Sequence, residues 1–429
     1  MNAAELVDYA KSLDCVHCGL CLRSCPTYRA TGRESASPRG RIHLMRAVAE
    51  EAATIDRSLL DELDGCLVCR NCESVCPSGV EYSQLLAHTK DATALHGARP
   101  LAGRLALRFG LRHVLTSRAM ISFGAVILRF AQRTGLTRWL GGFGGARGRA
   151  LASFPEVPAA EERRTLAPLH HPEGPLRGRV SVLEGCVMPA LLGRVNRATV
   201  RVLRAAGREV HVPRSPTCCG ALHAHNGDLA TARELARRTI AAHEVFRDLE
   251  GRPAPVVVNS AGCSAQMKEY GELLAEDVAW RERAEAFSSR VRDLSEYLAE
   301  GALSDLRPRL AATPATFELP LTYDDPCHLC HGQGVRAQPR RVLDELGLER
   351  IELEESESCC GSAGLYSALR PVDSQAVLAP RLEALRRSGA RTLVTANPGC
   401  HLQWQSGATA SDLDVEVLHV AEVLERSLD

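Results

Sequence analysis

Two cysteine runs near the N-terminus have the spacing of metal-binding loops. The first is Cys15-x-x-Cys18-x-x-Cys21-x-x-x-Cys25-Pro26, and the second is Cys66-x-x-Cys69-x-x-Cys72-x-x-x-Cys76-Pro77. Thiolates at this spacing bind iron–sulfur clusters in the bacterial pattern that ends in proline. A zinc site is the weaker interpretation, because zinc uses two close pairs of ligands at longer separation. The runs therefore predict two [4Fe–4S] clusters.

The fourth cysteine of each run is expected to bind the cluster of the other run. Three cysteines separated by two residues each wrap one loop around three irons, whereas the fourth lies beyond the turn. The first loop set is Cys15, Cys18, Cys21 and Cys76, and the second loop set is Cys66, Cys69, Cys72 and Cys25. Loss of either run should therefore damage both clusters.

The other cysteines form a pattern that occurs twice. Each unit has a single cysteine, then 31 residues, then Cys–Cys–Gly, and finally a cysteine after a short apolar run. The first Cys–Cys–Gly set is Cys186, Cys218, Cys219 and Cys263, and the second Cys–Cys–Gly set is Cys327, Cys359, Cys360 and Cys400. The equal spacing indicates an internal duplication.

Adjacent cysteines before Gly220 and Gly361 suit a polynuclear site. Glycine permits positive φ or a close backbone approach, so that both thiolates can point at one cluster. Buried structural thiols are the alternative, which the duplication disfavours. Additional iron–sulfur clusters are therefore expected in these units. Cys330 is expected to be incidental, because the first unit has Pro189 at the matching place.

Five histidines lie beside these cysteines. They are His328, His331 and His401 next to single cysteines, and His223 and His225 after the first Cys–Cys–Gly. The first three are expected to donate hydrogen bonds to cluster sulfur and not to bind iron. For the other two, packing of the turn is the default, and protonation coupled to reduction is the alternative.

The elements that must position these residues divide the chain into four expected domains, 1–95, 96–175, 176–305 and 306–429. In the first, a helix over 41–53 places Ile42, Met45 and Val48 at helical spacing. In the last two, strands are expected at 179–183, 209–212, 256–259, 321–324, 350–353 and 392–395. Helices are expected at 198–206, 229–246, 340–346 and 374–387. This α/β alternation predicts mostly parallel sheets with the cysteines at the carboxyl ends of strands.

The second domain is a basic connector without cysteine. Residues 96–155 contain ten arginines and no acidic residue, and a glycine-rich loop is expected over 141–148. The composition is typical of basic amphipathic helices. A solvated or domain-packed arginine face is the first interpretation, and an anionic membrane surface or a partner protein is the alternative.

Composition excludes other classes of function. The 52 basic and 52 acidic residues balance, and aromatic residues make up 4%, so nucleic acid is not an expected partner. Residues 1–14 lack the apolar core of a secretory signal, and the apolar run at 120–128 is far shorter than the roughly 20 residues of a membrane span. A cytoplasmic protein, at most peripheral to a membrane, is expected. No dinucleotide or phosphate-binding glycine motif is present, so flavin chemistry is expected in another chain.

The whole chain resembles the iron–sulfur subunit of glycolate oxidase (glycolate dehydrogenase). The resemblance rests on residues 15–19, 25–28, 38–42, the run CLVCRNCESVCPSG at 66–79, and residues 359–364 and 394–400. It implies an α+β multidomain fold, with an N-terminal α-helical ferredoxin domain followed by duplicated α/β CCG domains. It also implies FAD-containing partner subunits that oxidise glycolate to glyoxylate, and electron transfer to a quinone or other membrane-bound acceptor. No catalytic residue is assigned to this chain.

The duplicated units also resemble the CCG-containing subunit of heterodisulfide reductase, which uses a fifth thiolate in a terminal Cys-x-x-Cys for a noncubane cluster. Here the units end in Cys263-Ser264-Ala265-Gln266 and Cys400-His401-Leu402-Gln403, so the fifth thiolate is missing. Four thiolates per unit suffice for a conventional cluster. A thiol/disulfide oxidoreductase, a subunit of an anaerobic glycerol-3-phosphate dehydrogenase and a zinc scaffold are the alternatives.

Overall fold

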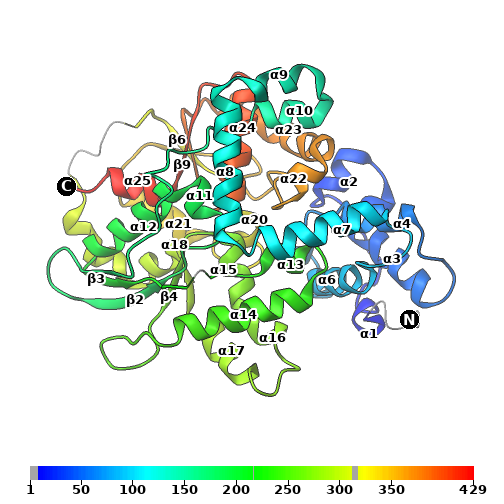
Figure 1. The fold of residues 1–429 in the computed structure, drawn as a ribbon, viewed down its shortest axis with the longest axis horizontal. Helices are drawn as coiled ribbons and strands as arrows, with labels where there is room; N and C mark the ends of the chain where they lie inside the picture. Colours follow the sequence, from blue (N-terminus) through cyan, green and yellow to red (C-terminus); the bar gives the residue numbers. More distant parts are fainter. Residues whose placement is uncertain (1–7, 216, 312–316) are drawn as a thin grey trace.

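The N-terminal part of the chain folds as short helices separated by the cysteine loops (Figure 1). The computed structural model describes residues 8–429 except 216 and 312–316, so the opening segment 1–14 lies partly outside the described residues. The helices are α1 (Tyr9–Ser12), α2 (Pro26–Thr31), η2 (Glu34–Ala36), α3 (Pro38–Ala49), α4 (Arg57–Asp64), α5 (Asn71–Ser74) and α6 (Tyr82–Thr93). Ser37 caps α3 by accepting a hydrogen bond from Gly40 N at 3.0 Å. Ile42, Met45 and Val48 are buried in the core of these helices, as the apolar spacing of α3 predicts.

The connector is helical from residue 101 to residue 152. It contains α7 (Leu101–Phe109), the π-helix η3 (Gly110–Val114), α8 (Arg118–Arg133), α9 (Leu136–Phe143) and α10 (Gly145–Ala152). The expected glycine-rich loop over 141–148 is wrong, because most of these residues belong to α9 and α10. A Cβ on Gly148 would lie 2.4 Å from Leu140 O, so the glycines instead let these two helices pack closely.

No single helix in the described parts of the chain is long and apolar enough to cross a membrane. Residues 101–114 and α8 pass that test of length and composition only as a pair, and the pair is bent by 109°.

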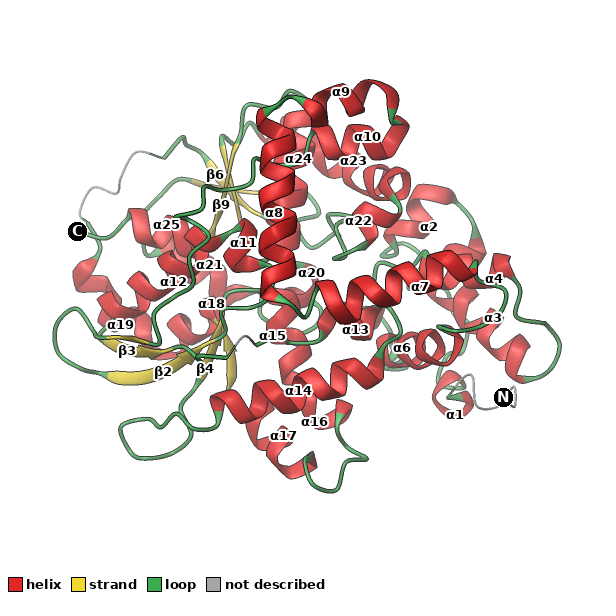
Figure 2. Cartoon of the chain, viewed as in Figure 1, coloured by secondary structure: helices red, strands yellow, loops and turns green. Residues whose placement is uncertain are grey.

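The duplicated part contains two separate sheets (Figure 2). The first unit has β1 (Leu169–His170), β2 (Gly178–Val182), α11 (Met188–Leu191), α12 (Gly193–Ala205), β3 (Arg208–His211), α13 (Ala221–His225), α14 (Leu229–His243), β4 (Val256–Val258), α15 (Ala261–Lys268), α16 (Tyr270–Leu273), α17 (Arg281–Ser288) and β5 (Val291–Asp293). A helical link follows, with α18 (Leu294–Tyr297), η4 (Leu298–Ala302), α19 (Leu303–Leu306) and η5 (Arg307–Arg309).

The second unit repeats this order of elements. It has β6 (Leu321–Tyr323), α20 (Cys327–Cys330), α21 (Ala337–Asp344), β7 (Arg350–Glu352), α22 (Tyr366–Leu369), α23 (Pro371–Ser388), β8 (Thr392–Thr395), α24 (Pro398–Ala410), β9 (Glu416–His419) and α25 (Val420–Arg426). The strand orders are β1-β3-β2-β4-β5 and β7-β6-β8-β9, and every pair is parallel except β1 with β3. The parallel sheets confirm the prediction, and the matching order reflects the duplication. The sequence patterns missed β1, β5 and β9.

The two units share one apolar core. Buried side chains of both sheets, including Val182 and Val394, belong to the same cluster. The units also exchange hydrogen bonds, because Ala261 N donates to Ala396 O at 3.1 Å and His419 Nε2 donates to Asn259 O at 3.0 Å. The ends of β4 and β8, which lead to the last cysteine of each unit, therefore lie against each other.

Candidate iron–sulfur sites

The second loop set is assembled in the structure as its spacing predicts. Its four thiols line one small cavity between α2, α5 and the loop that follows α4. Burial raises the pKa of the Cys72 thiol, and the neighbouring sulfurs of Cys69, Cys66 and Cys25 act in the same direction. Cys25 therefore lies with the second run, although the chain places it in the first.

The first loop set is nearer to the surface. Cys18 is exposed, and the other three thiols are half-buried. Burial raises the pKa of Cys21, whose neighbours include Cys15 and Cys25. Cys76 packs against the same apolar cluster as Cys15 and Cys21.

Both loops contain backbone in the left-handed region on either side of the middle cysteine. The residues are His17 (φ 56°) and Gly19 (φ 83°) around Cys18, and Val68 (φ 53°) and Arg70 (φ 62°) around Cys69. Successive turns of this kind direct backbone N–H groups into a concavity that binds anions, including iron–sulfur clusters. Val68 is β-branched, and such a residue is strained by about 1–3 kcal/mol in this conformation. Strain repeated at the equivalent position of two loops points to a binding function.

The first Cys–Cys–Gly set forms a chain of thiol contacts. Cys186 lies next to Cys218, Cys218 next to Cys219, and Cys219 next to Cys263, close enough for each thiol to shift the pKa of its neighbour. The neighbouring Cys186 thiol lowers the pKa of Cys218, and the Cys219 thiol adds to this effect. The cysteines come from the segments after β2, β3 and β4, at the carboxyl ends of neighbouring parallel strands.

The second Cys–Cys–Gly set has the same arrangement after β6, β7 and β8. Cys359 lies next to Cys327 and Cys360, and Cys360 lies next to Cys400, close enough for each thiol to shift the pKa of its neighbour. Gly361 has φ 82°, and a Cβ there would lie 2.6 Å from Ser374 O. Both uses of glycine that the sequence predicts therefore apply at this position.

The donor chemistry of all four sets fits iron–sulfur clusters. Each set offers four soft thiolate donors on short loops, which is the number that a [4Fe–4S] cluster requires. In the part of the chain that the structure describes, no group of three or more His, Cys, Asp and Glu side chains has the arrangement of a site for one metal ion.

A contact that the sequence did not indicate joins two of these sets. The thiol of Cys69, in the second loop set, lies next to that of Cys359, in the second Cys–Cys–Gly set, and each shifts the pKa of the other. Leu67, Tyr366 and Val377 pack around the two cysteines and bury them from solvent. His328 Nε2 donates to Val68 O at 2.8 Å, which fixes the two loops to each other.

The histidines beside the cysteines bind protein groups in other segments. His331 Nε2 donates to Glu357 O at 2.9 Å, and His401 Nε2 accepts from Arg194 at 3.2 Å. His223 Nε2 donates to Leu111 O at 2.8 Å, consistent with the packing role expected for that turn. The ring of His225 lies 5.1 Å from that of His328. Hydrogen bonds from His328 and His401 to cluster sulfur remain a prediction, whereas that from His331 is wrong, because its Nδ1 is hydrogen-bonded to Ser74 and Arg336 and its Nε2 to Glu357.

Cys330 is separated from its neighbouring set. Its side chain is buried and faces the backbone carbonyls of Asp325 and Cys327, at 3.9 and 3.8 Å. Burial raises the pKa of this thiol well above its usual value. The sulfur is therefore held as a neutral thiol that donates to backbone oxygen.

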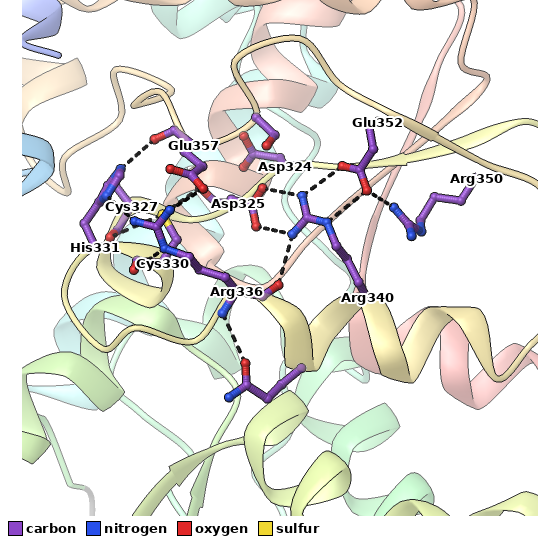
Figure 3. A network of polar contacts seen from close by, with 12 residues as sticks. Asp324, Asp325, Cys327, Cys330, His331, Arg336, Arg340, Arg350, Glu352 and Glu357 are labelled. Carbon is purple, nitrogen blue, oxygen red and sulfur yellow. Dashed lines mark hydrogen bonds and ion pairs between the residues drawn. The ribbon is translucent and has the colours of Figure 1, made fainter. Parts of the chain in front are cut away.

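A polar network supports the second Cys–Cys–Gly set (Figure 3). Arg340 binds both carboxylate oxygens of Asp325 at 2.7 and 2.8 Å, and it also binds Glu352 at 2.9 Å. Arg381 pairs with Asp324 at 3.1 Å, and both side chains are at most 2% exposed. Sequence reasoning missed these residues, although two adjacent acidic residues directly after a buried strand are a usable signal.

A larger cavity of about 670 Å³ touches the second loop set at Cys66. It lies under α7 and between α6, α13 and α22, and Leu107, Leu111 and Tyr366 are among its lining residues. The buried Lys90 also lines it, and its ammonium group donates to His225 O at 3.3 Å. Burial lowers the pKa of Lys90.

Comparison with known protein families defines the class of this protein. Residues 11–80 match the model of the 4Fe-4S dicluster domain, and residues 180–268 and 321–405 each match the model of the cysteine-rich domain. With the loops and sheets described above, this makes the chain an iron–sulfur protein with a ferredoxin-type N-terminal domain and two repeated CCG domains.

Relatives narrow the class to one family. The chain is 35% identical to the probable glycolate oxidase iron-sulfur subunit of Bacillus subtilis (strain 168), over 98% of this chain and 95% of that protein. It is 34% identical to the glycolate oxidase iron-sulfur subunit of Escherichia coli (strain K12), over 97% and 94%. The chain therefore belongs to the family of glycolate oxidase iron–sulfur subunits.

A more distant relative is a subunit of the fumarate reductase (CoM/CoB) of Methanothermobacter marburgensis. It is 26% identical over 97% of this chain and 73% of its own length. Lactate utilization protein A of Bacillus subtilis is 28% identical over 57% of this chain and 98% of its own length.

Proposed function

We propose that this chain is the electron-transfer subunit of a complex in which FAD-containing subunits oxidise glycolate to glyoxylate. The full-length similarity to glycolate oxidase iron–sulfur subunits supports this proposal. The observation that carries it is the buried contact of Cys69 with Cys359, together with the hydrogen bond from His328 to Val68 O, which holds a ferredoxin loop against a CCG domain.

The proposed ligands are the two loop sets for two [4Fe–4S] clusters and the two Cys–Cys–Gly sets for additional clusters. Clusters in these sites, when bound, supply one-electron transfer. The chain's own residues contribute burial and hydrogen bonding, which tune such sites. Leu67 and Tyr366 exclude water from the contact between Cys69 and Cys359, and His328 keeps the two loops together.

The proposed acceptor is a quinone or another membrane-bound carrier, and the cavity under α7 suits its head group. The cavity is lined by apolar side chains such as Leu107 and Leu111, and it reaches Cys66 of the second loop set. Lys90 has further N–H donors to offer a carbonyl oxygen in that space. The proposed location of the complex is the cytoplasm, with the protein peripheral on the inner face of the cytoplasmic membrane.

The test is anaerobic purification of the complex from its native host. We expect co-purification with flavoprotein subunits and roughly eight or more irons per chain with acid-labile sulfide. We also expect glycolate to reduce the clusters, which electron paramagnetic resonance measures. Reduction by glycerol 3-phosphate and not by glycolate would assign the chain to the other dehydrogenase, and zinc without iron would refute the redox function.

A further inference from the structure

The connector exposes an unusual amount of apolar side chain on three consecutive helices. The exposed residues are Leu101, Leu105 and Phe109 on α7, Met120, Phe123, Val126, Ile127 and Phe130 on α8, and Leu136, Trp139 and Phe143 on α9. Among the described residues, these helices hold every exposed phenylalanine and the exposed tryptophan. Soluble proteins rarely leave a contiguous apolar patch of this size uncovered.

The exposed residues follow helical spacing, so each helix presents an apolar stripe. On α7 they lie at every fourth position, and on α8 Phe123, Ile127 and Phe130 fall on one side. The other side of α8 packs inward, where Ala125 contacts a cluster with Val157 and Ala190. α8 is thus apolar on two faces, and only the inner one is covered by the described parts of the chain.

The charge around these stripes has one sign. Arg112 and Arg118 bind inward to Asp228 and Glu184. The exposed side chains of Arg133, Arg138, Arg147 and Arg149 make no ion pair or hydrogen bond with any described residue. Residues 96–155 contain no acidic residue that would offset them.

The helices also lie in a favourable geometry for a flat surface. The structure is drawn down its shortest axis in Figure 1, and α7 and α8 run across its near, broad face. Residues 101–114 and α8 meet at a bend of 109°, so α8 does not continue the direction of α7. α9 continues from the end of α8, and its Trp139 and Phe143 rings contact each other with centroids 5.4 Å apart.

We propose that α7, α8 and α9 form an interfacial binding surface for an anionic lipid bilayer. Helices of this type place their apolar face at the boundary between head groups and acyl chains, while arginines bind the anionic head groups. The inference deepens the proposed peripheral location, on which it rests, by naming the surface. It also puts the open side of α7, the helix above the cavity at Cys66, next to the lipid phase. A flavoprotein subunit docking on this face is the competing occupant.

The test uses the full-length, cluster-loaded protein and vesicles of phosphatidylcholine with about one third phosphatidylglycerol. The protein should sediment with these vesicles, and its affinity for vesicles of pure phosphatidylcholine should be at least about tenfold lower. Salt at about 0.5 M should weaken binding to the anionic vesicles. Brominated acyl chains should quench the fluorescence of Trp139, and a Trp139→Phe variant should lose that quenching, because Trp404 is fully buried and the half-buried Trp280 lies under Arg283, outside the connector.

A matched pair of variants locates the surface. Phe123→Glu with Phe130→Glu should abolish vesicle binding, whereas Val245→Glu with Val278→Glu, which changes exposed apolar residues elsewhere, should not. Both variants should keep the iron content and the dye-linked glycolate oxidation of the complex. Iron content and glycolate oxidation therefore test the proposed function, and vesicle binding separately tests the proposed surface. Three results would overturn the proposal. The first is unchanged vesicle binding by the variant with Phe123→Glu and Phe130→Glu, and the second is equal binding of the native protein to neutral and anionic vesicles. The third is loss of the flavoprotein subunits from that variant instead of loss of vesicle binding.

Discussion

The thiols of Cys69 and Cys359 lie next to each other in one buried cluster, although 290 residues separate them in the chain. The contact lies between the middle cysteine of a ferredoxin loop and the first cysteine of a Cys–Cys–Gly motif. Val68, directly before Cys69, is held at φ 53° and accepts a hydrogen bond from His328. The ferredoxin domain and the second CCG domain therefore meet at their proposed cluster ligands and not at a distant surface.

Replacement of Cys69 should remove one particular cluster. A Cys69→Ser variant is expected to lose about four irons per chain, with the signal of the cluster in the second loop set. Cys25→Ser should give the same spectrum, because Cys25 lies beside Cys69 and Cys72. Iron analysis and electron paramagnetic resonance measure this. Cys330→Ser is the control and should keep all the iron, and a Cys25→Ser spectrum like that of Cys18→Ser would contradict the crossed pairing.

The glycine after the second cysteine pair should not tolerate a side chain. Gly361 has φ 82°, and its Cβ would collide with Ser374 O at 2.6 Å, so Gly361→Ala must displace Cys359 and Cys360. We expect loss of the cluster of the second Cys–Cys–Gly set, measured as iron and sulfide per chain. Gly389→Ala is the matched control, because Gly389 has φ 69° with open space around it. Equal iron in both variants would show that the close approach is not needed.

The buried ion pair behind this set should be important for stability. Arg381 binds Asp324 and also donates to the carbonyls of Glu354 and Ser356. Arg381→Met would leave Asp324 buried without its partner, which costs about 3–5 kcal/mol. Denaturant unfolding measures the loss. Arg386→Met removes an exposed pair with Glu383 and should cost at most about 1 kcal/mol. A similar small cost for Arg381→Met would refute a structural role for the pair.

His243 should make the protein less stable in mild acid. Burial lowers its pKa to about 3, and Arg290 adds to the effect; its Nδ1 is hydrogen-bonded to Ser181 Oγ at 2.6 Å. Because the unfolded chain takes up a proton near pH 6.5 and the native chain does not, stability falls as pH decreases below that value. From about pH 7 to about pH 5.5 the loss is about 1.3 kcal/mol for this residue.

The measurement is the free energy of unfolding against pH. His243→Asn keeps a partner for Ser181 but cannot be protonated, so its slope over this range should be smaller by that amount. The control is His211→Asn at a half-buried histidine beside Glu209, and this replacement should leave the slope over this pH range unchanged. A slope unchanged by His243→Asn would mean that another group governs the acid sensitivity.

Filling the cavity under α7 should block the acceptor and spare the upstream reaction. Leu107→Trp places a bulky ring among the lining residues. Reduction of a short-chain quinone should fall by about tenfold or more, while glycolate-dependent reduction of the clusters persists. Ala106→Trp lies on the exposed side of the same helix and should leave both rates unchanged. Equal quinone reduction in the two variants would place the acceptor site elsewhere.

The sequence by itself determined the chemistry of this protein and its local order. The cysteine spacing predicted the four thiol sets, the fixed offset between units predicted the duplication, and the alternation of strands and helices predicted parallel sheets. These features are readable because ligand loops and buried strands impose local patterns. The strands β1, β5 and β9 were missed; all three lie at the edge of a sheet, where each pairs with only one neighbouring strand.

Only the tertiary structure decided how these parts meet. The glycines at 141–148 allow either a loop or a tight pair of helices, and packing of α9 on α10 selects the helices. The contact of Cys69 with Cys359 joins two domains, and the pairing of Arg381 with Asp324 joins α23 to the end of β6 within one domain; both are buried only in the folded chain. Spacing along the chain carries no information about such contacts, because they arise from the shape of surfaces far apart in the sequence.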